Sequence, residues 1–151
     1  MTNTSKYKFQ VLLLLTIGTF NIFQTGPNNE KKFVTEKEYQ KNLVRQLKWT
    51  PQTIAELRKN NVTENSELKL RYSFYTNSLY KAKSLAKELD KLNYKTEFAK
   101  DSYNPKQFEI TGWTTKIKIA EPVLLSWTKQ MCQTGYKYDC DFDGWETKLD
   151  Q

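Results

Sequence analysis

Histidine is absent from the 151 residues of this chain. Because histidine is the usual general base near neutral pH and the commonest metal ligand, its absence excludes most catalytic arrangements and most zinc sites. Only two cysteines are present, and no candidate nucleophile lies in a pattern that supplies it with a base. We therefore predict that the protein is not an enzyme, has no catalytic residues, and uses no cofactor or metal.

Glycine and proline are also scarce, with five and four copies. Disordered chains are poor in apolar residues, whereas 38 % of this chain is apolar and 14 % is aromatic. The length suits one hydrophobic core with a short appendage. We expect a single folded domain.

Acidic residues are few in the first part of the chain. Residues 1–63 hold ten Lys or Arg and four Asp or Glu, whereas residues 64–151 hold fourteen and thirteen. The net charge of +7 thus comes mostly from the N-terminal part, so it does not mark the main domain as a nucleic-acid binder.

The apolar run VLLLLTIGTFNIF, residues 11–23, is too short to cross a bilayer as a helix. Lys6 and Lys8 precede it, which is the order of a secretory signal, although QTGPNN after it offers no small-residue cleavage site. We predict that residues 1–26 are a signal or membrane-tethering segment of an exported or tethered protein, and that membrane contact is limited to this segment. The alternative is a buried or interfacial helix in a cytoplasmic protein.

Residues 27–63 are predicted to form a linker and a helical arm. VTEKEYQKNLVRQLKW begins with a capping box, in which Thr35 and Glu38 each accept a hydrogen bond from a free backbone N–H. TPQTIAELRKNN repeats the start signal, with Thr50 as N-cap and Pro51 at the first helical position. We therefore expect two short helices. A DNA-binding helix-turn-helix is disfavoured, because few apolar residues support the second helix.

Apolar and polar residues alternate from Leu68 onward, which indicates a strand with one buried face. The next segment, TNSLYKAKSLAKELDKLN, places leucines and alanines on one side of a helix. YKTEFA and QFEITGWTT predict two strands, AEPVLLSWTKQMCQTG a helix that stops at Gly135, and YKYDCDF a last strand. The order βαββαβ predicts an α+β fold over residues 64–151: a ferredoxin-like sandwich whose four-stranded antiparallel sheet carries two helices on one face.

The C-terminal stretch DCDFDGWETKLD has almost the acidic spacing of an EF-hand calcium loop. An EF-hand requires a curled loop between two helices, whereas Asp139, Asp141 and Asp143 here alternate with apolar residues as they would in a strand. We expect the three carboxylates to be splayed along one exposed strand face. No calcium site is predicted.

The two cysteines are predicted to lie on different elements. Cys132 lies near the end of the last predicted helix, and Cys140 lies on the last strand. Because a helix packs about 10 Å above a sheet, we expect their Cα atoms to be farther apart than the roughly 7 Å that a disulfide allows. Both are interpreted as small buried thiols.

Three stretches together carry a resemblance to a known family: LKLRYSFYTN, ITGWTTKIKI and YDCDFDGWET, with helices between them. Over about residues 67–147 the chain resembles the ribonuclease E inhibitor family, regulator of ribonuclease activity B (RraB). FDGWET, residues 142–147, is the most specific element, and YSFY is weaker. The resemblance implies a ferredoxin-like, non-catalytic protein whose partner is an endoribonuclease bound through its scaffold region.

The first functional hypothesis is a protein-binding regulatory module. Its predicted partner-binding residues are Asp139, Asp141, Asp143, Trp145 and Glu146, which would attract a basic, Arg-rich segment through charge-assisted hydrogen bonds and stacking. The alternative is that these acids only protect an edge strand, with Trp145 as a lid on the core.

The second hypothesis is binding of single-stranded RNA. Tyr75, Trp113 and Arg71 are expected on the open sheet face, where RNA-recognition motifs of this topology stack bases. QFEITGWTT contains no run typical of those motifs, so nucleic acid is the less favoured partner. A third possibility is an exported RraB-like protein with an unrelated partner.

Overall fold

The structure is a computed structural model and describes residues 31–149. The prediction for residues 1–26 therefore lies outside the described part. Within residues 31–149, no helix has both the length and the apolarity to cross a membrane.

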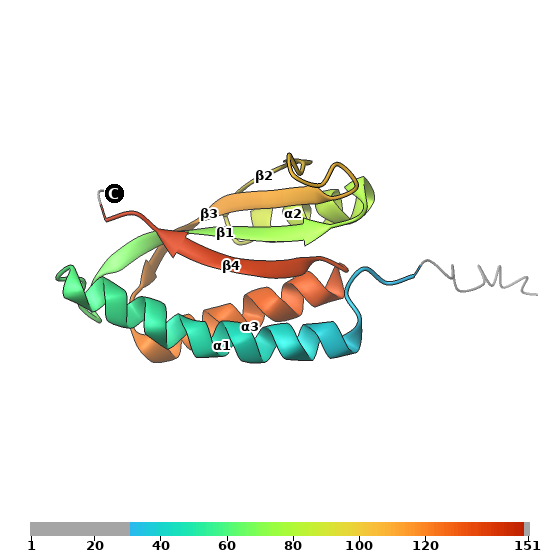
Figure 1. The fold of residues 1–151 in the computed structure, drawn as a ribbon. Coiled ribbons are helices and arrows are strands. Elements are labelled where there is room, and N and C mark those ends of the chain that lie inside the picture. Colours follow the sequence, from blue (N-terminus) through green and yellow to red (C-terminus); the bar gives the residue numbers. More distant parts are fainter. Residues whose placement is uncertain (1–30, 150–151) are drawn as a thin grey trace, which may run out of the picture. The chain divides into compact units, whose positions relative to one another are not determined.

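Three helices and four strands make up this part of the chain (Figure 1). After a first helix the order is βαββαβ, and the strands form one antiparallel sheet in the order β2-β3-β1-β4. The α+β class and the four-stranded antiparallel sheet are thus confirmed. The elements are α1 (Glu36–Lys59), β1 (Glu67–Thr76), α2 (Leu79–Asp90), β2 (Lys95–Lys100), β3 (Phe108–Lys118), α3 (Glu121–Lys137) and β4 (Asp141–Thr147).

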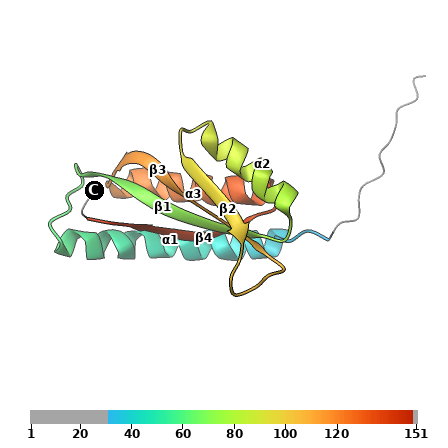
Figure 2. The same cartoon turned by 90° about the horizontal axis from the view of Figure 1, so that it is seen from above.

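One face of the sheet carries the core. Leu70, Tyr72 and Phe74 of β1 are buried, while the residues between them are more exposed, as the alternation predicted. Ala82, Leu85 and Leu89 of α2 join the same hydrophobic cluster, as do Leu124, Trp127 and Met131 of α3. The first helix, α1, runs beside α3 and next to β4 (Figures 1 and 2).

The prediction of two short helices before the sheet was wrong, because α1 is one continuous helix of 24 residues. Its capping box at Thr35 and Glu38 is confirmed. Thr50 is not an N-cap but lies inside the helix, where its hydroxyl is 3.0 Å from the Gln46 carbonyl and 2.9 Å from the Thr128 hydroxyl of α3. Burial of one face along α3 and β4 therefore outweighs the local start signal at Pro51.

Gly135 does not end α3, which continues to Lys137. A Cβ atom at Gly135 would lie 2.6 Å from the Cys140 carbonyl and 2.9 Å from the Phe74 ring, so glycine is required here by close packing. The left-handed residue is Asp139, with a φ of 56°. As a result β4 begins at Asp141, later than the alternation suggested.

The two cysteines are free and buried, as predicted. Burial raises the pKa of both thiols to about 12. At neutral pH they are therefore protonated and poorly nucleophilic.

Candidate functional site

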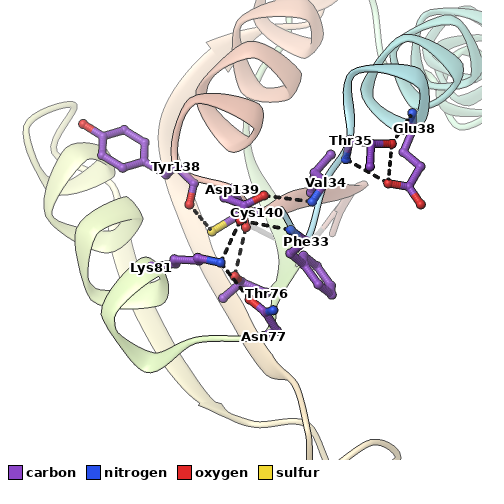
Figure 3. A network of polar contacts seen from close by, with 10 residues as sticks. All are labelled: Phe33, Val34, Thr35, Glu38, Thr76, Asn77, Lys81, Tyr138, Asp139 and Cys140. Carbon is purple, nitrogen blue, oxygen red and sulfur yellow. Dashed lines mark hydrogen bonds and ion pairs between the residues drawn. The ribbon is translucent and has the colours of Figure 1, made fainter. Parts of the chain in front are cut away.

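The three aspartates before and on β4 do not form the predicted strip. Asp139 lies in the turn after α3, and its carboxylate accepts hydrogen bonds from the backbone N–H groups of Phe33, at 3.0 Å, and Val34, at 2.8 Å. Lys81 of α2 lies 2.7 Å from the same carboxylate (Figure 3). Burial alone would raise the pKa of Asp139, but the hydrogen bonds from Lys81, Phe33 and Val34 outweigh it and lower the pKa. Asp139 is thus engaged within the fold.

Asp141 faces α1. Its carboxylate accepts a hydrogen bond from the Asn42 side chain at 2.7 Å. Burial raises the pKa of Asp141, and the nearby Arg45 and the Asn42 hydrogen bond offset this only in part. The prediction that all three aspartates point away from the core along one strand face was therefore wrong.

Asp143 is exposed because it is the extra residue of a β-bulge. Ser73 pairs with Gly144, whereas the next residue of β1, Phe74, pairs with Phe142. Gly144 has a φ of 142°, a conformation that residues with a Cβ rarely adopt. The bulge shifts the alternation by one residue, which turns the side chain after Gly144 back toward the core.

Trp145 is that side chain. It pairs with Tyr72 across the sheet and packs edge-on against Trp127 of α3, with ring centroids 6.2 Å apart. Its indole nitrogen is 3.4 Å from the Thr50 hydroxyl of α1. Trp145 is partly buried against the core cluster, so its ring connects β4 to both helices below it.

The outer edge of β4 is covered by α1. The Asn42 side chain donates to the Phe142 carbonyl at 2.7 Å, and the Gln46 side chain donates to the Asp143 carbonyl at 2.8 Å. Both polar side chains are buried, with exposed fractions of 7 % and 2 %. A helix thus satisfies strand carbonyls that would otherwise be open to pairing with another chain.

A cavity of about 390 Å³ opens between α1, β1 and β4, beside the bulge. We call it the β4 groove. Three carboxylates and one guanidinium line it, so its charge is mainly negative. Arg71 pairs with Glu146 at 3.0 Å on the exposed surface, and the Tyr75 hydroxyl is 3.5 Å from Glu109. The residues that line the β4 groove include Trp49, Thr53, Arg71, Ser73, Tyr75, Glu109, Asp143, Gly144, Trp145 and Glu146.

Tyr75, Trp113 and Arg71 share the open sheet face, as predicted. Arg71 is paired with Trp113 across β1 and β3, and Tyr75 is paired with Glu109. Carboxylates accompany two of the three residues, because Glu146 pairs with Arg71 and Glu109 lies beside Tyr75. A phosphate approaching this face would meet these negative charges.

A model of the family described as Regulator of ribonuclease activity B matches residues 48–147. The chain belongs to this family. The RraB match begins inside α1 and includes the whole sheet, which confirms the resemblance seen in the sequence. RraB proteins are regulatory and act on ribonuclease activity, which is consistent with a protein that is not an enzyme. A search of curated proteins finds no match.

The stretch FDGWET, residues 142–147, forms the bulged part of β4. Phe142 fills the core, Asp143 is the bulged residue, Gly144 supplies the conformation that the bulge requires, and Trp145 returns to the core. The motif therefore encodes the shape of one wall of the β4 groove.

Sequence reasoning missed the contribution of α1 to this site. Asn42, Gln46 and Thr50 are polar residues at i, i+4 spacing on the face that packs inward. That spacing was the available signal, since polar residues in line on the buried face of a helix require partners.

Within residues 31–149, no group of three or more acidic or cysteine side chains is arranged to hold a metal ion.

Proposed function

We propose that this RraB-family chain is a non-catalytic module that regulates a ribonuclease of the ribonuclease E class by binding a basic segment of its scaffold region. The observation that supports this most directly is the β4 groove. Its exposed carboxylates lie within the residues that match the family. We also propose that the domain is ferredoxin-like, which the order βαββαβ and the sheet order β2-β3-β1-β4 support.

The predicted contact residues divide into two roles in this proposal. Asp143 and Glu146 contact the partner directly, because both are exposed at the groove. Asp139 and Asp141 hold the frame around β4 through their hydrogen bonds to the segment before α1 and to α1. Trp145 supports the groove from beneath.

A guanidinium group suits the β4 groove chemically. Arginine forms bidentate, charge-assisted hydrogen bonds with carboxylates and stacks on aromatic rings. Asp143 and Glu146 provide the carboxylates, and Trp49 provides a ring with 48 % of its surface exposed. One face of the Trp49 ring is occupied by Arg45, whose guanidinium carbon lies 5.2 Å from the ring centroid, so a guanidinium of the partner would stack on the opposite face or displace Arg45.

The test is binding to, and inhibition of, a purified ribonuclease E-type endoribonuclease that retains its scaffold region. We expect the double change Asp143→Asn and Glu146→Gln to weaken binding about tenfold at low salt, and less at high salt where exposed charges are screened. The matched control removes an exposed aspartate and an exposed glutamate elsewhere, Asp90→Asn and Glu64→Gln. Equal binding by the two double variants would remove the groove carboxylates from the function.

Single-stranded RNA remains the second candidate, because Arg71, Tyr75 and Trp113 share one sheet face. A salt titration of RNA binding separates it from the first. Phosphate contacts make the affinity for RNA fall steeply as the salt concentration rises. Trp113→Ala and Tyr75→Ala remove rings on which bases would stack, so they should abolish RNA binding if this candidate is correct. An exported protein with an unrelated partner is a third candidate, which cell fractionation and N-terminal sequencing of the mature protein would test.

A further inference from the structure

The outward face of α1 carries a row of basic residues. Positions 37, 41, 44, 48, 52, 55 and 59 follow one another at three- and four-residue spacing, so they lie on one side of the helix. All seven are exposed, and none is acidic. We call this face the basic stripe; it consists of Lys37, Lys41, Val44, Lys48, Gln52, Ala55 and Lys59.

The lysines in the first half of the basic stripe are available for an external anion. Among the residues that the structure describes, the four ion pairs involve Lys59, Arg71, Lys81 and Lys91, and none involves Lys37, Lys41 or Lys48. The two glutamates in the first turn of α1 accept hydrogen bonds from uncharged groups. Glu38 accepts from the Thr35 backbone N–H, and Glu36 accepts from the Gln40 side chain.

An apolar side chain stands among these lysines. Val44 lies on the basic stripe with 68 % of its surface exposed, whereas Trp49 lies on the flank of α1 that lines the β4 groove. An exposed valine among lysines is typical of helices that lie in a membrane interface, where lysines contact headgroups and apolar groups enter the acyl boundary.

We propose that the basic stripe docks α1 lengthwise on an anionic lipid surface, which extends membrane contact beyond the residues 1–26 to which the sequence prediction confined it. The helix has 24 residues, so it presents a straight edge about 36 Å long. The opposite face of α1 is fixed against α3 and β4, which holds the stripe outward. The β4 groove is lined by the inward flank of α1, and its carboxylates are therefore kept away from the anionic surface.

The sequence before α1 favours lipid over nucleic acid as the partner. The apolar run of residues 11–23 ends thirteen positions before Glu36, and Lys6 and Lys8 precede it. A segment of that composition has affinity for the interface of a bilayer. A bilayer with anionic lipids would therefore suit both this composition and the charge of the stripe.

Co-sedimentation of the full chain with vesicles tests the proposal. Vesicles of phosphatidylcholine alone are compared with vesicles that also contain phosphatidylglycerol. The contribution of the basic stripe is measured as the preference of the protein for the anionic vesicles. We expect K37Q/K41Q/K48Q to reduce that preference at least about tenfold, because each lysine near an anionic surface contributes separately. K37R/K41R/K48R should retain it.

The matched control removes three exposed lysines from α2 and β3, K83Q/K87Q/K116Q, and should change the preference less than about twofold. Equal losses in the two triple variants, or a parent without preference for anionic vesicles, would overturn the proposal.

Loss of RNA binding by the stripe variant with unchanged vesicle binding would assign the stripe to nucleic acid instead. Ribonuclease binding in solution should be the same in both triple variants, so this test is independent of the groove.

Discussion

Asp139 connects the turn after α3 to two segments that are far apart in the sequence, the backbone before α1 and the β1–α2 junction. Its carboxylate binds the backbone before α1 and the Lys81 ammonium of α2, and its carbonyl accepts from the Thr76 hydroxyl at the end of β1 (Figure 3). The side chains of Asp139 and Lys81 are only 18 % and 16 % exposed. A single carboxylate in this position therefore affects stability more than its neighbours on β4.

We expect Asp139→Asn to lower the free energy of unfolding by about 1.5 to 3 kcal/mol, the range for hydrogen bonds to a charged group. Asparagine tolerates the left-handed backbone at this position, so the change removes charge without adding strain. Urea denaturation at pH 7 is the measurement. Asp143→Asn is the control, because this exposed side chain should change stability by less than about 0.5 kcal/mol. Equal effects of the two changes would mean that the Asp139 contacts do not stabilise the fold.

At the level of elements, α1 acts as a cover for the edge of β4. The Gln46 side chain is 2 % exposed and donates to two consecutive strand carbonyls, Asp143 at 2.8 Å and Phe142 at 3.3 Å. Methionine has nearly the same shape without the donor. We expect Gln46→Met to lower the free energy of unfolding by about 1 to 3 kcal/mol, because buried carbonyls lose their partner.

The control for this change is Gln52→Met on the exposed face of α1, which should alter stability by less than about 0.5 kcal/mol. Concentration-dependent sedimentation adds a second measurement, since an uncovered strand edge promotes association between chains. A Gln46→Met protein as stable and as monomeric as the Gln52→Met protein would contradict the role of α1 as a cover.

The elements that sequence reasoning predicted well are those whose pattern is local. The alternation of Leu70, Tyr72 and Phe74 specified β1 and its buried face without knowledge of any other segment. Two of the failures show the influence of longer-range effects. The start signal at Thr50 and Pro51 was overridden by packing on α3, and the period of β4 was broken by the bulge at Asp143.

The candidate site was harder to predict than the fold, because its walls come from distant residues. Asn42 and the Phe142 carbonyl that it binds are 100 positions apart. Nothing in either local sequence indicates the other. The spacing of Asn42, Gln46 and Thr50 shows only that partners must exist, and the three-dimensional structure is needed to show that β4 supplies them.

At the scale of the whole molecule, Asp139 and Asp141 give opposite contributions to the pH dependence of stability. The pKa of Asp139 is lowered in the folded protein, so its contribution is fully present above the unfolded value near 4 and is lost as the pH falls through the folded pKa. The pKa of Asp141 is raised, chiefly by burial, so protonation relieves a cost. That contribution is present below the unfolded pKa and is lost as the pH rises through the folded pKa.

Two single variants separate these contributions in melting curves recorded between neutral pH and about pH 3, near the unfolded pKa. Asp141→Asn should be as stable as the parent or slightly more stable at pH 7, because asparagine keeps an acceptor for Asn42 without a buried charge. Any advantage in stability should vanish as the pH falls through the folded pKa of Asp141. Asp139→Asn should be less stable than the parent at pH 7, and its deficit should shrink as the pH falls below about 4. Parallel curves for the parent and both variants would show that neither carboxyl changes its proton affinity on folding. Any loss of stability in acid would then have to arise from other groups.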